Sequence, residues 1–286
     1  MFVGMVHEAG KQVMKLLFDG DMLCHRMAAA VEERSPFNKE IIIKADPEEA
    51  WNCIELRIQE CERIAWEEFE EDIDTIITFS SPRNYRKDVN PEYKSNRKGK
   101  EKPIVFKEMV ERCKRNYDCE EWDGIEADDV MGILQKEDTI IVTGDKDLLQ
   151  IEGYHMNLIN PEAGIKFVTY AEGMELFWTQ CLSGDSVDGF YGCPKIGKKK
   201  ALQVIQDNNG LTPWERIVNT YKEAMSPKTQ TVTTDSGVKR IKKLKQYNLG
   251  LGESDALMTA RCAYILRNES EYNKDTGEVK LWQNGG

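Results

Sequence analysis

Short hydrophobic runs alternate with helix-forming segments along the first half of the chain. Residues 14–19 form an apolar run that ends in an acid, and residues 21–31 carry helix-forming side chains. This order predicts a strand that leads into a helix. Residues 46–71 begin with Asp-Pro-Glu-Glu, a helix-start signal, and predict a long helix. Residues 75–79 then predict a second strand.

The alternation continues after residue 102. One helix is predicted to begin near Pro103, and another is predicted at residues 126–134. A buried strand at 138–142 and a short helix at 145–149 are predicted to follow. Strands that alternate with helices predict an α/β fold, with a central, mostly parallel sheet flanked by helices. Because ligands of such sheets bind beyond the carboxyl ends of the strands, we expect the acids that follow these strands to converge in space.

One long segment breaks this pattern. Residues 81–102 lack apolar periodicity and hold eight basic residues against three acids, a local balance of 8 − 3 = +5 in a chain whose net charge is −11. The pattern is typical of an exposed, functional excursion. Residues 195–200 and 239–245 are also basic, although solvated surface charge explains 239–245 equally well. The polarised charge favours a nucleic-acid partner.

Composition narrows the class of protein. With 286 residues, 40% hydrophobic and 31% charged, the chain has the balance of one large globular domain or two packed ones. It has no apolar stretch long enough to span a bilayer, and residues 1–13 do not have the pattern of a signal peptide. The eight cysteines form no CxxC pair, which argues against zinc and favours reduced thiols in the cytoplasm.

Carboxylates gather in four clusters at the edges of apolar runs. The clusters are Asp19; Glu126, Asp128 and Asp129; Asp145 and Asp147; and Asp185 and Asp188. Packed carboxylates repel one another, so such a site needs divalent cations and usually performs phosphoryl chemistry. For the cluster at 126–129 alone, acids that complement a helix dipole are an equally good explanation.

The spacing of residues argues against two other motifs, an EF-hand and a P-loop. Residues 145–150 lack the later ligand and the turn glycine of an EF-hand. Residues 192–198 fit a P-loop up to its lysine, but Lys199 stands where a metal-binding Ser or Thr belongs. What remains is a glycine-flanked turn that can hold a phosphate at the start of a helix predicted for residues 198–205.

Five blocks of sequence carry a family resemblance. They are Leu-Leu-Phe-Asp-Gly-Asp at 16–21, Pro-Glu-Tyr-Lys-Ser-Asn-Arg at 91–97, Glu-Ala-Asp-Asp at 126–129, Thr-Gly-Asp-Lys-Asp at 143–147, and Gly-Asp-Ser-Val-Asp-Gly at 184–189 continued by residues 196–201. Over residues 14–208, the chain resembles the flap endonuclease and phage 5′→3′ exonuclease family. Residues 263–267 and 281–282 resemble the tail of the small phage branch.

The resemblance implies a PIN-like 5′ nuclease fold with a helical arch and a helix-three-turn-helix element that grips duplex backbone. We expect a nuclease domain at 14–180 with a basic arch at 81–102, and a mainly helical DNA-binding region at 181–286 with the element at about 184–207. It further implies a metal-dependent 5′→3′ exonuclease or flap endonuclease that acts on DNA in phage replication. The partner would be duplex DNA with 5′ single-stranded ends or flaps, or an RNA–DNA hybrid. The protein would act as a monomer and would not bind a membrane.

The implied chemistry is two-metal hydrolysis of phosphodiesters by Mg²⁺, with Mn²⁺ as a substitute and K⁺ as a candidate ion at the helix-three-turn-helix. The first ion would be served by Asp19, Glu126, Asp128, Asp129 and Asp145, and the second by Asp147, Asp185 and Asp188. Lys94 and Arg97 would act on the scissile phosphate, and Tyr85 and Tyr93 would stack on unpaired bases. The predicted DNA-binding residues are Arg86, Tyr93, Lys94, Arg97, Lys98, Lys195, Gly197, Lys198 and Lys200.

One departure from the family pattern leaves alternatives open. Where the family places another metal-binding Asp after the second strand, this chain has Ser80 and Ser81, which bring no charge. Asp21 is a candidate to compensate, although an N-cap role would also explain it. The alternatives are a DNA-binding protein of the same fold with a weakened metal site, and a related metal-dependent ribonuclease.

Overall fold

A computed structural model describes residues 13–37, 40–207, 209–225, 229–233, 239–243 and 252–284. Contacts divide the chain into two compact units, both discontinuous in sequence. Unit 1 holds residues 1–85, 99–173 and 265–280, and unit 2 holds residues 86–98, 174–264 and 281–286. The consecutive domains expected at 14–180 and 181–286 stay a prediction, but by contact the segment 86–98 groups with the second half and 265–280 returns to the first.

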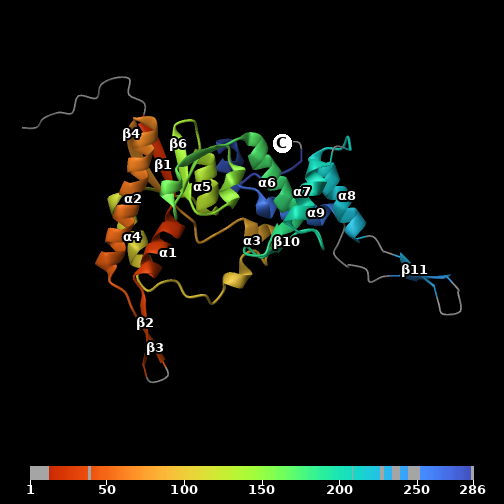
Figure 1. Cartoon of the computed structure of the whole chain (residues 1–286), viewed down its shortest axis with the longest axis horizontal. Helices are drawn as coiled ribbons and strands as arrows, with labels where there is room; N and C mark the ends of the chain where they lie inside the picture. Colours follow the sequence, from red (N-terminus) through yellow and green to blue (C-terminus); the bar gives the residue numbers. More distant parts are fainter. Residues whose placement is uncertain are drawn as a thin grey trace, which may run out of the picture. The chain divides into compact units, whose positions relative to one another are not determined.

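The core of unit 1 is a six-stranded sheet in the order β5-β4-β1-β6-β7-β8. Figure 1 labels three of these strands, β4, β1 and β6. Its parallel strands are β1 (Val13–Asp19), β4 (Asp72–Phe79), β5 (Asp118–Glu121), β6 (Thr139–Thr143) and β7 (Gly153–Asn157). The edge strand β8 (Ile165–Val168) pairs antiparallel with β7. The predicted, mostly parallel α/β sheet is confirmed.

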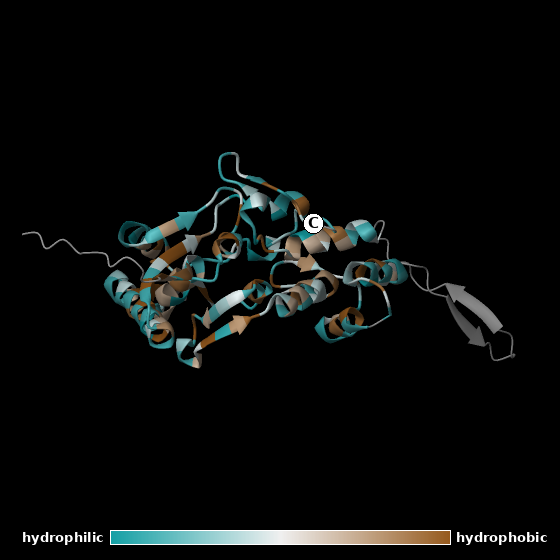
Figure 2. Cartoon of the chain, turned by 90° about the horizontal axis from the view of Figure 1, so that it is seen from above, coloured by the Kyte–Doolittle hydropathy of each residue, from teal (hydrophilic) through white to brown (hydrophobic). Residues whose placement is uncertain are grey.

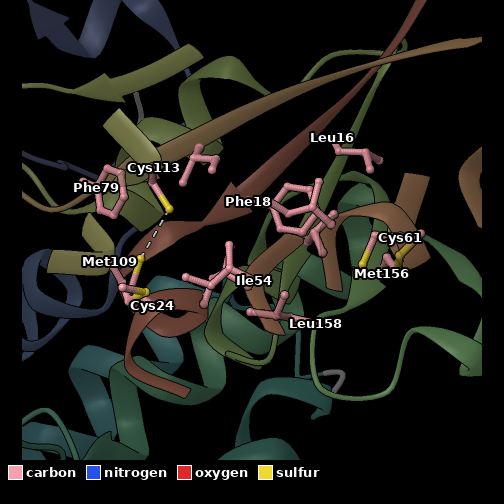
Figure 3. Close-up of a cluster of buried hydrophobic side chains, with 14 of the residues drawn as sticks. Leu16, Phe18, Cys24, Ile54, Cys61, Phe79, Met109, Cys113, Met156 and Leu158 are labelled. Carbon is pink, nitrogen blue, oxygen red and sulfur yellow. Dashed lines mark hydrogen bonds between the residues drawn. The ribbon is translucent and has the colours of Figure 1, made fainter. Parts of the chain in front are cut away.

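Helices cover both faces of this sheet because side chains alternate along each strand. Leu16 and Phe18 of β1 lie in one hydrophobic core with residues of α1 (Gly20–Ala30), α2 (Pro47–Phe69) and α4 (Phe106–Asn116). Figure 3 shows this core, in which the sulfurs of Cys24 and Cys113 are 3.7 Å apart. On the other face, Leu17 packs with residues of α5 (Ala127–Leu134).

Unit 1 also contains elements that the sequence pattern did not predict. An antiparallel pair, β2 (Glu33–Phe37) and β3 (Glu40–Lys44), follows α1. The 3₁₀ turn η3 (Pro161–Ala163) follows β7. A second 3₁₀ turn, η2 (Asp147–Gln150), follows β6 and lies where the sequence predicted a short helix at 145–149. The returning segment forms η4 (Glu269–Glu271) and the short pair β13 (Tyr272–Asn273) and β14 (Glu278–Val279).

Unit 2 is mainly helical in its described residues. Its helices are α3 (Arg86–Val89), η1 (Ser95–Arg97), most of α6 (Tyr170–Ser183), α7 (Lys198–Gln206), α8 (Pro213–Met225) and α9 (Glu253–Ala263). Between α6 and α7, the short strands β9 (Gly184–Asp185) and β10 (Phe190–Tyr191) pair. The segment predicted to be the helix-three-turn-helix, at about 184–207, thus follows α6 and contains the pair of strands and α7.

Packed aromatic side chains hold unit 2 together. Trp282 packs edge-on against Phe177 of α6 and Trp214 of α8, and the hydroxyl of buried Tyr221 donates to the carbonyl of Cys181, 3.0 Å away. The strands β11 (Thr229–Thr233) and β12 (Lys239–Lys243) pair antiparallel. Residues 244 and 245 of the predicted basic stretch lie outside the described residues.

Hydropathy follows these layers. Figure 2 shows brown, hydrophobic segments inside the packed elements and teal, hydrophilic segments on the outward sides of the helices. Among the helices that the structure describes, none has the length and apolar character that a membrane span requires.

Candidate active site

Asp19 stands at the carboxyl end of the central strand β1. Its Oδ1 accepts a hydrogen bond from the Met22 N–H at 2.9 Å, and its Oδ2 accepts one from the Thr143 hydroxyl at 2.9 Å. Burial, together with the nearby charges of Asp21 and Asp145, raises the pKa of Asp19 to about 6. The three acids therefore share one region of negative potential. Asp19 is also the N-cap of α1, the position that the sequence suggested for Asp21.

Asp21 instead faces the end of β4. Its Oδ2 accepts a hydrogen bond from the Ser80 N–H at 2.9 Å. The Ser80 hydroxyl in turn accepts one from the Ala127 N–H, in the first turn of α5, at 3.1 Å. These two bonds hold the start of α1, the end of β4 and the start of α5 at the same edge of the sheet. A carboxylate thus stands beside the position where the sequence has serine.

Ser81 has a different role. Its hydroxyl oxygen accepts hydrogen bonds from the N–H groups of Arg83 and Gly124, both at 3.3 Å. The side chain therefore fastens the turn after β4 to the loop before α5.

The acids at residues 126–129 open α5. Glu126 is buried and is the N-cap residue, Asp128 is half-buried in the first turn, and Asp129 is fully buried. The Oδ2 of Asp129 accepts from the Glu126 N–H at 3.2 Å, and its Oδ1 accepts from the Leu266 N–H at 3.1 Å. Asp129 therefore has a structural role at the start of the helix, and its predicted role as a direct metal ligand remains a prediction.

Asp145 and Asp147 lie on the turn that follows β6. The Asp145 N–H donates to the Thr143 hydroxyl at 3.0 Å, and the Asp147 N–H donates to the Asp145 carboxylate at 2.9 Å. Both side chains are half-buried. Since Thr143 also binds Asp19, this turn is tied directly to the end of β1.

Six of the eight predicted metal ligands thus belong to unit 1, and Asp185 and Asp188 belong to unit 2. Within the described ranges, no three His, Cys, Asp or Glu side chains are close enough together to hold a metal ion. The donors nevertheless suit a hard cation, because they are carboxylate oxygens and because a carboxylate whose pKa is raised by burial gains most from a compensating positive charge. Metal binding by these residues remains a prediction.

In unit 2, Asp188 is surrounded by the residues predicted to act on the phosphate. The Tyr93 hydroxyl donates to its carboxylate at 3.1 Å, the Lys94 ammonium lies 3.4 Å away, and Arg97 forms an ion pair with it. The neighbouring Asp185 accepts from the N–H groups of Val187 and Asp188, which fixes the turn between β9 and β10. In this structure, ion pairs with Asp188 therefore hold the side chains of Lys94 and Arg97 in place.

Three residues that were predicted to contact DNA are buried in the structure. Arg86 is 2% exposed, and its guanidinium donates to the carbonyls of Cys262 and Tyr264 at the end of α9, at 3.0 and 2.5 Å. In this structure the side chain thus satisfies the last carbonyls of a helix, and direct contact between Arg86 and DNA stays a prediction. Tyr85 and Tyr93 are also buried, and the Tyr93 ring stacks on Phe190. Stacking of these rings on unpaired bases stays a prediction.

The other predicted DNA-binding residues lie at the surface. Lys98, Lys195, Lys198 and Lys200 are exposed, and Lys198 and Lys200 occupy the first turn of α7. Gly197 is the N-cap of this helix, and a Cβ there would meet none of the described atoms within 4 Å. The basic surface at the start of α7 is thus open to an anionic partner, and its binding to DNA remains a prediction.

The sequence missed one residue that shapes this region. The Asn96 amide donates to the carbonyls of Ser186 and Val187, both at 3.1 Å, and so joins segment 86–98 to the turn of β9 and β10. An exposed asparagine in a charged segment gives no signal of such a role, because its partners lie about ninety residues away along the chain.

Comparisons with known proteins identify the family. Residues 14–177 match the model of the 5′-3′ exonuclease N-terminal, resolvase-like domain. The chain therefore belongs to the 5′-3′ exonuclease family, as the sequence motifs predicted.

The relatives include proteins of similar length. The chain is 28% identical over 293 residues to the exodeoxyribonuclease of Enterobacteria phage T3, which covers 93% of this chain and 92% of that protein. It is 26% identical over 289 residues to the exonuclease of Escherichia phage T7, which covers 94% of this chain and 93% of that protein. It is also 31% identical over 152 residues to DNA polymerase I of Rhizobium leguminosarum, which covers 48% of this chain and 15% of that protein.

Proposed function

We propose that this protein is a metal-dependent 5′→3′ exonuclease with flap endonuclease activity that hydrolyses the phosphodiester bonds of DNA. The carrying observation is that Asp19, Asp21 and Asp145 share one acidic region at the carboxyl end of the parallel strands. The family match and two phage exonucleases that align over almost the whole chain support the same activity. By analogy with these relatives, we assign the activity to phage DNA replication in the host cytoplasm.

Mg²⁺ is the ion we propose for this site, because it prefers oxygen ligands and pairs with phosphate. Asp19, Glu126, Asp128 and Asp145 would hold it, with Asp147 at the adjoining turn, while Asp185 and Asp188 would serve a second ion. When bound, the ions supply a nucleophilic water of lowered pKa and positive charge at the leaving oxygen. Asp129 keeps the start of α5 in place, and the hydroxyl of Thr143 orients the Asp19 carboxylate.

Lys94 and Arg97 provide positive charge for the phosphate backbone. Asp188 holds both in place, so a phosphate that approaches them competes with this carboxylate. Asp188 therefore keeps Lys94 and Arg97 ordered until an anionic substrate binds. The exposed Lys198 and Lys200 at the start of α7 add a second contact with duplex backbone.

The substrate we propose is duplex DNA with a 5′ end or flap, bound by one copy of the chain. The test uses the full chain with 5′-labelled duplex, 5′-flap and RNA–DNA hybrid substrates, in Mg²⁺ or in EDTA. We expect short 5′ products in Mg²⁺ only. Release of short products from the hybrid, with intact duplex DNA, would instead favour the ribonuclease alternative.

A pair of matched variants tests the site. Asp145→Asn removes a carboxylate at the proposed centre, and Asp74→Asn makes the same change at an exposed position within β4, away from the carboxyl end. We expect Asp145→Asn to abolish cleavage while duplex affinity is kept, and Asp74→Asn to cleave normally. Binding of duplex without cleavage by the wild-type chain would favour the weakened DNA-binding protein.

A further inference from the structure

The returning segment 265–280 of unit 1 packs on the helix that carries the acids of residues 126–129. Ile265 is buried in the same hydrophobic cluster as Leu17 of β1 and Ala127 and Met131 of α5. The next residue, Leu266, donates its N–H to the Asp129 carboxylate at 3.1 Å, and the other oxygen of that carboxylate accepts from the Glu126 N–H. One buried side chain thus joins the segment to the first residue of the acidic cluster.

The backbones of α5 and the returning segment approach closely. A Cβ at Gly132 would lie 2.2 Å from the carbonyl oxygen of Leu266, a distance that no side chain can occupy. The helix therefore needs glycine at this position if the segment is to stay in place. This close contact fixes the position of the segment along the axis of α5. It therefore also aligns the Leu266 N–H with the Asp129 carboxylate.

The same segment also supports the loop that leads into Glu126. The Tyr272 hydroxyl donates to the carbonyl of Asp123 at 2.8 Å, and the Tyr272 ring stacks on Trp122 with ring centres 5.5 Å apart and planes 13° apart. The Lys274 ammonium lies 3.8 Å from the centre of the Trp122 ring. Trp122 and Asp123, four and three residues before Glu126, are therefore held by the segment.

We propose that segment 265–280 positions the acidic cluster at the start of α5. It is attached at two points, through the hydrogen bond from Leu266 to Asp129 and through the contacts of Tyr272 with the loop before the helix. The proposal rests on the proposed function and assigns work to a segment that lies beyond residues 14–177 of the family match. Neighbouring carboxylates repel one another, so a site built from them needs rigid support to keep its geometry. The segment supplies that support by holding both the loop and the first turn of the helix.

The test compares Tyr272→Ala with Tyr272→Phe in the full chain, with Tyr170→Ala at an exposed tyrosine of α6 as the matched control. The first readout is the affinity for Mn²⁺ alone, measured by calorimetry. The second is the Mg²⁺ concentration that gives half-maximal cleavage, and the third is the affinity for duplex DNA in EDTA. All measurements are made at a temperature where thermal unfolding shows each variant to be fully folded.

We expect Tyr272→Ala to weaken Mn²⁺ binding and to raise the Mg²⁺ requirement about tenfold, as loss of supporting contacts does at metal sites. Tyr272→Phe keeps the stacking on Trp122 and should recover most of the loss, while duplex affinity stays within about twofold of wild type. If Tyr272→Ala does not fold, the same three measurements are made on Gly132→Ala, which displaces the Leu266 carbonyl, and are compared with those on Tyr272→Phe.

Unchanged Mn²⁺ affinity in folded Tyr272→Ala would overturn the positioning role and leave the proposed function intact. Equal losses in Tyr272→Ala and Tyr170→Ala would also overturn it, because the effect would not be specific to the segment. A wild-type chain that neither binds Mn²⁺ nor cleaves would instead refute the proposed function. The two failures are therefore distinguishable.

Discussion

Buried His155 should make the protein lose stability as the pH falls below neutrality. The side chain is 3% exposed on β7 and its Nε2 lies 2.8 Å from the carbonyl oxygen of Ile151. Among the described residues, its Nδ1 has no hydrogen-bond partner. Burial, together with the charge of Lys166 on the neighbouring strand, lowers the pKa of His155 from 6.5 to about 4.

The sign follows from proton uptake. Between pH 6.5 and about 4 the unfolded chain binds a proton at this histidine and the folded chain does not, so acid favours unfolding. The fall of the pKa from 6.5 to about 4 corresponds to about 3 kcal/mol when the histidine is fully protonated in both states. The loss amounts to about 1 kcal/mol at pH 5.5 and roughly 2 to 3 kcal/mol at pH 4.5. This is a large part of the 5 to 15 kcal/mol that is usual for a domain.

Urea denaturation of the wild type and of His155→Gln at pH 7.5, 5.5 and 4.5 isolates this contribution. Asp19, whose pKa burial raises to about 6, titrates in the same range with the opposite sign, but it is present in both proteins and cancels in the comparison. We expect the wild type to lose the calculated amount relative to His155→Gln as the pH falls. Parallel pH profiles of the two proteins would refute the reasoning.

Three further predictions concern the site and its supports. Asp21→Asn should raise the Mg²⁺ requirement of cleavage several-fold, since it removes a charge beside the end of β4, and an unchanged metal titration would show that Asp21 lies outside the metal site. Lys198→Ala should weaken duplex binding and reduce its salt dependence by about one ion, whereas an unaltered slope in a binding titration would exclude the phosphate contact. Arg86→Met should cost about 3 kcal/mol in a denaturant titration because the carbonyls at the end of α9 lose their donor, and a loss of DNA affinity without loss of stability would contradict its structural role.

The strands and helices around the site could be predicted because their signals are local. Residues 14–19 and 138–142 are apolar because they cross the centre of the sheet, and the start of α2 is marked by Asp46 and Pro47. The acids at the ends of β1 and β6 were also found from the sequence, since parallel strands bring their carboxyl ends to one edge. Short elements such as β2, β3 and β13 escaped because they lack a repeated pattern.

The roles of charged and aromatic residues were less predictable. Arg86, Tyr93 and Lys94 all lie in a basic segment that has the composition of an exposed arm. In the structure, Arg86 and Tyr93 are buried and Lys94 pairs with Asp188. Their partners lie more than ninety residues away along the chain, so no local pattern distinguishes a cation that binds phosphate from one that binds a carbonyl or a carboxylate.

By itself, the sequence determined the α/β class, the order of its main strands and the set of acids at their ends, because periodicity and chain order encode all three. Only the tertiary structure decided which acids are supports and which remain candidates for chemistry. Asp129 is held by the Leu266 N–H, and Asp21 stands beside Ser80. Such assignments depend on the free energy of contacts between distant segments, which exist only when the chain is folded.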